Sequence, residues 1–203
     1  IRKGSTYGLF LQENKAIWIG SANGLHKLDF NKQVFKKIDL APVSKGANLL
    51  PVGSIAAEKS SNESDTRLWM HVPYHGGHVY DIAQRTFENI PAAVAKYFQP
   101  PTNFWDVFID KNNTAWIATG QYGLVGYHVS KKQIIVPEKK YFHKDWEWVN
   151  GFFEDSKDGI WLQTFNGLFK IDKTTNEITE VQELNRVLES EGLSKSIMGI
   201  DED

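Results

Sequence analysis

The segment GIWLQTFNGLFKID, residues 159–172, has nearly the same pattern as AIWIGSANGLHKLD, residues 16–29. In both segments an apolar residue precedes a Trp, a Gly precedes a closing apolar stretch, and an Asp ends the segment. Two further segments, RLWMHVPYHGGHVYD (67–81) and TAWIATGQYGLVGYH (114–128), share this pattern with one extra residue between Trp and Gly. The chain therefore contains four copies of one repeat.

The repeat has the length of a propeller blade. Its anchors are Trp18, Trp69, Trp116 and Trp161, separated by 51, 47 and 45 residues, and propeller blades repeat at roughly 40 to 50 residues. Each copy contains four short apolar or alternating stretches separated by turn residues, for example SKDG, FNG and KTTN in the last copy. An antiparallel sheet with two apolar faces has to stack on copies of itself. The sequence therefore predicts an all-β fold, a β-propeller of four-stranded antiparallel blades.

We expect residues 1–203 to form a single propeller fragment with four blades. Their approximate ranges are 5–40, 52–92, 103–138 and 148–184. The segment SIMGIDED, 196–203, resembles the opening strand VNGFFEDS, so a fifth blade is expected to start over 195–203. Four blades then belong to a larger ring, within the range of roughly 4 to 8 blades that propellers show.

Two sets of residues in the repeat are expected to be structural. The four Trp anchors are expected to fill the space between neighbouring blades, so that Trp161→Ala would cost about 3 to 5 kcal/mol. The Gly after each loop is expected to supply the positive φ of a tight turn. These glycines are Gly24, Gly77, Gly123 and Gly167.

Composition excludes several classes of function. A net charge of −2 over 203 residues gives no basic surplus for nucleic acid, and the 41% hydrophobic content is enough for a sizeable core. The absence of cysteine removes disulfides and thiolate metal sites. No apolar run approaches the ~20 residues of a membrane helix, so we expect no membrane contact by this region. No cofactor is expected.

Candidate ligand-binding residues lie in the loops that crowd one face of a propeller around its channel. These loops join the second and third strands of a blade, or one blade to the next. The candidates are Asn23, Tyr74, His75, Trp105, Gln121, Tyr122, Trp146, Trp148, Phe165 and Asn166. Turn formation by Asn-Gly is the alternative for the first kind of loop, and packing between blades is the alternative for Trp146 and Trp148, which alternate in an extended segment.

The loop MHVPYHGGH holds His71, His75 and His78, but its spacing is poorly suited to a metal. Zinc needs three or four converging donors, whereas this loop contains Pro73 and two glycines and no carboxylate before Asp81. Hydrogen bonds to a ligand and a plain surface loop both remain open. No catalytic residue is predicted, because no nucleophile elbow, phosphate loop or zinc helix motif appears.

The segment EDSKDGIWLQTFNGLFKID resembles the two-component regulator propeller repeat. The matching residues are Glu154, Asp155, Gly159, Trp161, Thr164, Gly167, Leu168, Phe169 and Asp172. The first copy matches through Glu13, Trp18, Gly20, Ser21, Gly24, Leu25 and Asp29. The second copy departs through its longer turn KSSNESDTR, and the third ends in His128 where Asp is usual.

This resemblance implies a periplasmic sensor, the extracytoplasmic part of an inner-membrane hybrid two-component regulator whose histidine kinase lies outside this region. It further implies a ring of about seven blades, an oligosaccharide ligand, a second propeller as partner, and a homodimer in the full receptor. Two alternatives remain: a module for protein docking or dimerisation without a small ligand, and a lyase or hydrolase acting on carbohydrate.

Overall fold

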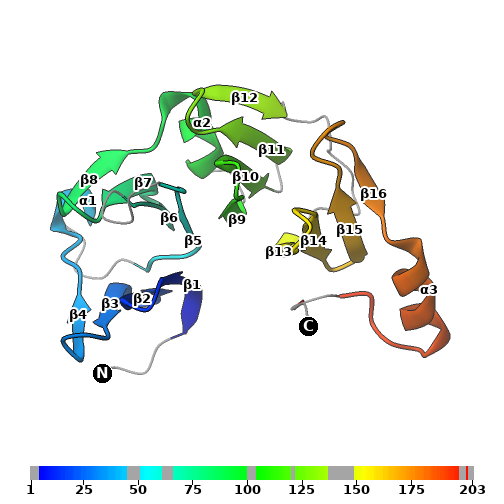
Figure 1. The fold of residues 1–203 in the computed structure, drawn as a ribbon, viewed down its shortest axis with the longest axis horizontal. Coiled ribbons are helices and arrows are strands. Elements are labelled where there is room, and N and C mark those ends of the chain that lie inside the picture. The colour runs from blue at the N-terminus through cyan, green and yellow to red at the C-terminus, as the bar shows by residue number, and fades with distance from the viewer. Residues whose placement is uncertain are drawn as a thin grey trace. The chain divides into compact units, whose positions relative to one another are not determined.

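The computed structural model describes residues 5–44, 51–60, 66–99, 104–119, 122–136, 149–196 and 200. The chain divides into two compact units, residues 1–101 and 102–203. Each unit contains two four-stranded antiparallel sheets, drawn in Figure 1. These sheets confirm the predicted all-β fold of four-stranded propeller blades.

The first unit contains blades 1 and 2. The strands of blade 1 are β1 (Thr6–Gln12), β2 (Ala16–Ser21), β3 (Gly24–Asp29) and β4 (Val34–Lys37). The strands of blade 2 are β5 (Ile55–Ala57), β6 (Arg67–Val72), β7 (Gly76–Asp81) and β8 (Thr86–Asn89). The helical segments of this unit are α1 (Ala41–Ser44), α2 (Ala92–Ala95) and the 3₁₀ helix η2 (Lys96–Phe98).

The second unit contains blades 3 and 4. The strands of blade 3 are β9 (Phe104–Ile109), β10 (Thr114–Thr119), β11 (Gly123–His128) and β12 (Gln133–Val136). The strands of blade 4 are β13 (Val149–Glu154), β14 (Ile160–Thr164), β15 (Gly167–Ile171) and β16 (Ile178–Glu180), and helix α3 (Gln182–Ser190) follows them. In every sheet the strand order is the chain order, because short turns join consecutive strands.

The cores of the two units lie between their blades. In the first unit, Trp18 and Tyr80 meet with ring centres 5.7 Å apart, in a cluster that joins both blades. In the second unit, Trp116 belongs to a cluster with Ile160 and Leu162 of blade 4. The side chains of Trp18, Trp69 and Trp116 are 2%, 0% and 1% exposed. An apolar blade face is thus covered by the next blade or by the segment that leads to it.

Trp161 differs from the other three anchors because its side chain is only partly buried. Lys170 Nζ lies 4.5 Å from the centre of its ring. Since less apolar area leaves water, the cost of 3 to 5 kcal/mol expected for Trp161→Ala is too high, and it applies to a wholly buried anchor such as Trp116.

The turn glycine of blade 2 is Gly76 and not Gly77. Gly24, Gly76, Gly123 and Gly167 have φ of 116°, 90°, 71° and 134°. In blade 2, Val72 pairs with Gly76, so the loop is Pro73–His75 and Gly77 already lies inside β7. A Cβ on Gly77 would lie 2.8 Å from the Phe98 ring. The requirement at Gly77 is therefore close packing, which any side chain would prevent.

Blade 4 was expected to extend to residue 184, but its last strand ends at Glu180 and helix α3 begins at Gln182. The segment QELNRVLES contains good helix formers, and its helix begins at Gln182, directly after β16. The fifth blade expected over 195–203 falls mostly outside the described residues. Its existence, the single-fragment organisation and the size of the ring stay predictions.

Candidate functional site

The turns between the second and third strands share one hydrogen-bonded arrangement in blades 1, 3 and 4, whereas blade 2 has Val72 at the equivalent position. The hydroxyls of Ser21, Thr119 and Thr164 accept backbone N–H groups from Asn23, Tyr122 and Asn166, at 3.1, 2.9 and 3.1 Å. The same hydroxyls donate to the carbonyls of Gly24, Gly123 and Gly167. This arrangement explains why the repeat places Ser or Thr three residues after Trp, and it gives the turn residues a structural role.

The predicted ligand-binding residues are placed as follows. Tyr74 is 88% exposed with φ of 65°, Phe165 is 45% exposed, and Asn166 is also exposed. His75 is half-buried, and its carbonyl lies 3.1 Å from His78 Nε2. Asn23 and Tyr122 are half-buried in their turns. Gln121, Trp146, Trp148 and the side chain of Trp105 lie outside the described residues, so the shared rim stays a prediction.

In blades 2 and 4, the segment that follows the blade packs against the start of its third strand. Phe98 lies against Gly77 of blade 2. In blade 4, buried Asn185 of α3 accepts the Leu168 N–H at 3.2 Å and donates to Glu180 at 2.8 Å. Much of the polar capacity on this face is therefore used within the fold.

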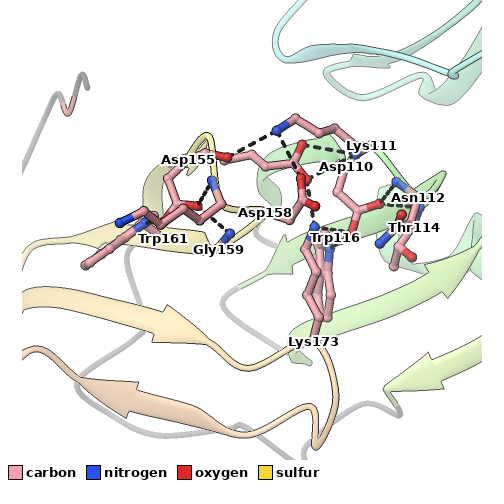
Figure 2. Close-up of polar contacts among 12 residues, drawn as sticks. Asp110, Lys111, Asn112, Thr114, Trp116, Asp155, Asp158, Gly159, Trp161 and Lys173 are labelled. Atoms are coloured by element: carbon pink, nitrogen blue, oxygen red, sulfur yellow. Dashed lines mark hydrogen bonds and ion pairs between the residues drawn. The ribbon is translucent and has the colours of Figure 1, made fainter. Parts of the chain in front are cut away.

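A second recurring arrangement ties each Trp to the end of the first strand of its blade, and Figure 2 shows two cases. Trp116 Nε1 donates to Asp110 Oδ2 at 3.1 Å, and Trp161 Nε1 donates to Asp155 Oδ2 at 2.8 Å. In blade 2 the acceptor is Glu58, at 2.6 Å. The acidic residue of the repeat thus orients the indole ring, which is a structural role.

The acidic groups of the second unit are held by several donors each. Burial alone would raise the pKa of Asp155, but hydrogen bonds from Trp161 and Gly159 and the charge of Lys170 outweigh burial and lower it. Lys173 Nζ lies 2.7 Å from Glu154 Oε1 and 3.7 Å from Asp110 Oδ2, as Figure 2 shows in part. These carboxylates are paired and hydrogen-bonded, as expected for groups that stabilise turns.

The histidine loop of blade 2 contains one strongly shifted group. Burial, with a smaller contribution from the charge of His78, lowers the pKa of His71 to about 4. His71 is therefore neutral at physiological pH. Among the described residues, no group of three or more His, Cys, Asp or Glu side chains is placed to hold a metal ion.

A basic groove lies between blades 1 and 2, at the turns that join their third and fourth strands. Its volume is about 220 Å³. The residues that line it are Trp18, Lys27, Asp29, Lys32, Val34, Lys36, Ile38, Tyr80, Ile82 and Arg85. The groove therefore combines an apolar floor with a cationic rim, on the opposite side of the blades from the turns in which candidates were predicted.

Sequence reasoning missed this groove. The signal was present in HKLDFNKQVFKK, which holds four lysines between residues 26 and 37. Arg85 occupies the corresponding turn of blade 2. Such a run is usually a solvated face, and only the strand register shows which lysines share one side.

Comparisons with known proteins establish the fold. No protein-family model matches the chain, and no curated protein is similar to it. Among solved structures, the chain is similar to the extracellular domain of BT4673 from B. thetaiotaomicron, named as a proposed one-component system. The sequence identity is 21% and the TM-score is 0.65, and the match covers 97% of this chain and 25% of that chain.

Two further structures agree. The extracellular domain of BT3049 from B. thetaiotaomicron, named as a proposed hybrid two-component system, has 20% identity and a TM-score of 0.61 over 86% of this chain and 23% of that chain. The Cps50 (Swd1) β-propeller domain of Myceliophteria thermophila has 12% identity and a TM-score of 0.57 over 88% of this chain and 55% of that chain.

The chain spans about a quarter of the length of the two B. thetaiotaomicron domains. The helices of the described residues are all too short or too polar to cross a membrane. At identities this low, structural likeness carries the architecture and not the activity. The chain therefore has the fold of a β-propeller.

Proposed function

We propose that this chain belongs to the extracytoplasmic sensor region of a bacterial hybrid two-component receptor, and that this region binds an oligosaccharide in the periplasm. The observation that carries the proposal is the structural likeness to the extracellular domain of BT4673, which extends over 97% of this chain. The repeat EDSKDGIWLQTFNGLFKID supports it independently, since it resembles the repeat of such receptors.

Binding rather than catalysis is favoured by the state of the acidic residues. A general acid or base has to reach a substrate proton. Asp110 and Asp155 instead accept hydrogen bonds from their own turns and from indole N–H groups. The proposal therefore assigns no catalytic residue, and it places a histidine kinase outside this region. A second propeller and a second copy of the receptor are its proposed partners.

The test is thermal unfolding of the purified protein against a panel of oligosaccharides. A ligand at about 100 times its dissociation constant adds roughly 2.7 kcal/mol to the free energy of unfolding, which raises the midpoint visibly. We expect one glycan family to raise the midpoint without being cleaved. Cleavage would indicate a lyase or hydrolase, and no shift with any glycan would favour protein docking.

A further inference from the structure

We infer that the groove between blades 1 and 2 binds an anionic group, a sulfate ester or a carboxylate, carried by the oligosaccharide. This inference deepens the proposed function and rests on it. Four cationic side chains and one carboxylate line the groove. They are Lys27, Lys32, Lys36, Arg85 and Asp29. Lys and Arg donors form charge-assisted hydrogen bonds with anionic oxygens such as those of a carboxylate, and a sulfate ester presents oxygens of the same kind.

The register of blade 1 places two lysines side by side. Lys27 of β3 is the cross-strand partner of both Trp18 of β2 and Lys36 of β4. Like charges directly opposite each other on a sheet destabilise it. A bound anion between the two ammonium groups would reverse that effect, because it would interact favourably with both.

The cationic charge of the groove is only partly neutralised within the described part of the chain. The Asp29 carboxylate lies 3.8 Å from Lys27 Nζ. No described carboxylate lies within 4 Å of the charged groups of Lys32, Lys36 or Arg85. The groove therefore has an excess of positive charge, although the whole chain has a net charge of −2.

The other blades show that the repeat does not require this charge. The positions equivalent to Lys27 and Lys36, read from the strand register, are occupied in order by Val79 and Glu88, by Gly126 and Val136, and by Lys170 and Thr179. A purely structural feature of the blade would recur. The pair of lysines is therefore a property of blade 1 alone.

The acceptor of the indole hydrogen bond also distinguishes blade 1 from the other blades. Trp18 Nε1 donates to the neutral Gln12 Oε1 at 3.0 Å, whereas the other three anchors donate to carboxylates. In blade 4 the carboxylate of Asp155 also lies 3.5 Å from Lys170, the equivalent of Lys27. In blade 1 the indole acceptor carries no charge, and the only described carboxylate beside Lys27 is Asp29, at 3.8 Å. Lys27 and Lys36 therefore share a single counter-charge.

The shape of the groove suits a chain of sugars better than a lone ion. A second hollow of about 510 Å³ shares Ile38, Tyr80 and Arg85 with the groove. A third hollow of about 420 Å³ shares Pro42 and Phe87 with the second. The three hollows lie beside the outer strands β4 and β8. The excess of positive charge is at one end, and the other two hollows have mixed linings that include Asp39 and Glu88. An anionic sugar at the charged end would leave neutral sugars along the other two hollows.

The experiment is calorimetric titration of the purified protein with four probes. They are a sulfated oligosaccharide, a uronic-acid oligosaccharide, a neutral oligosaccharide of the same length, and inorganic sulfate. We expect one of the anionic oligosaccharides to bind at least about tenfold more tightly than the neutral one, with an affinity that falls as salt is raised. The two anionic probes distinguish the sulfate ester from the carboxylate.

Variants locate the binding. Lys36→Gln and Arg85→Gln are each expected to weaken binding of the anionic oligosaccharide about tenfold, since each removes one charge-assisted hydrogen bond. Lys36→Arg keeps the charge and should retain most of the affinity. Lys157→Gln, an exposed lysine of the β13–β14 turn, is the matched control and should leave binding unchanged. An unchanged circular dichroism spectrum shows that each variant is folded.

The outcomes separate this inference from the proposed function. Equal binding of neutral and anionic oligosaccharides, unaffected by Lys36→Gln and Arg85→Gln, would overturn the inference and leave the sensor proposal standing. Inorganic sulfate binding as tightly as the oligosaccharides would also overturn it, because the sugar would then contribute nothing. If no oligosaccharide binds at all, the proposed function fails, and the inference fails with it.

Discussion

Replacing Trp116 by Ala is expected to lower the free energy of unfolding by about 3 to 5 kcal/mol. The side chain is 1% exposed and packs in the cluster between blades 3 and 4. A Trp buries ~150 to 250 Å², which at roughly 25 cal/mol/Å² gives about 4 to 6 kcal/mol as an upper bound. The substitution also removes the indole donor from the buried carboxylate of Asp110.

Trp161→Ala is the matched comparison, because the same repeat position is only partly buried in blade 4. One face of its ring lies beside Lys170 Nζ, so less apolar contact is lost. We expect a cost of about 1.5 to 2.5 kcal/mol, roughly half of that for Trp116→Ala. Trp116→Phe weighs the two effects, since it keeps most of the apolar volume and removes the hydrogen bond to Asp110.

The assay is urea unfolding followed by far-ultraviolet circular dichroism, because tryptophan fluorescence changes with the substitution itself. With a slope of ~1 to 3 kcal/mol per molar urea, a difference of 1 kcal/mol moves the midpoint by roughly 0.3 to 1 M. Equal costs for Trp116→Ala and Trp161→Ala would refute the link between burial by the next blade and stability. A changed slope would instead indicate that the surface exposed on unfolding has changed or that unfolding is no longer two-state.

Three further predictions concern pH, a helix and the basic groove. The free energy of unfolding should fall by up to about 3 kcal/mol as pH drops from about 6.5 to about 4. Burial lowers the pKa of His71 to about 4, so in this range the unfolded chain binds a proton that the folded chain does not. The urea midpoint of His71→Gln should therefore depend less on pH than that of the unsubstituted protein. Asn185→Ala should cost about 1 to 3 kcal/mol, because it leaves the buried N–H of Leu168 without its acceptor, and hydrogen exchange at that amide should be faster. Without ligand, Lys36→Gln should raise the free energy of unfolding by roughly 0.2 to 1 kcal/mol in low-salt urea titrations, because it relieves repulsion with Lys27; a lower midpoint would contradict the like-charge argument.

The blades could be predicted from sequence because the repeat averages out local ambiguity. A short stretch such as IWLQT is compatible with a strand or a buried helix. Four copies with the same turn chemistry and the same Trp position remove that ambiguity. The anchors Trp18, Trp69 and Trp116 are buried where the spacing places an inter-blade core.

Details that depend on one blade alone could not be predicted. In HGGH, either glycine fits the alignment, and only the pairing of Val72 with Gly76 decides which one ends the turn. Among the described residues of the other connections, no helix reaches the length of α3, so the repeat did not predict it. Asn185 appears unremarkable in sequence, yet it is 2% exposed and joins the helix to β15.

The basic groove was missed for a related reason. Lys27 and Lys36 are nine positions apart, and sequence alone does not show that they face each other across β3 and β4. The repeat instead predicts a site at equivalent positions of the blades, which Asn23, Tyr122 and Asn166 occupy. The structure gives these residues the same hydrogen bond in each turn. These residues occupy equivalent positions because each turn of this kind needs the same hydrogen bond.

A repeat protein therefore contains its own control for function. A residue type that recurs among the blades has a sufficient explanation in the fold, as Ser21, Thr119 and Thr164 do through the turns of three blades. A charged residue that departs from the repeat has no such explanation, and it costs stability unless something compensates for it. Lys36 meets both conditions, because its equivalents are Glu88, Val136 and Thr179 and its cross-strand neighbour has the same charge. The position of Lys36 therefore supports the inferred anionic ligand of the groove.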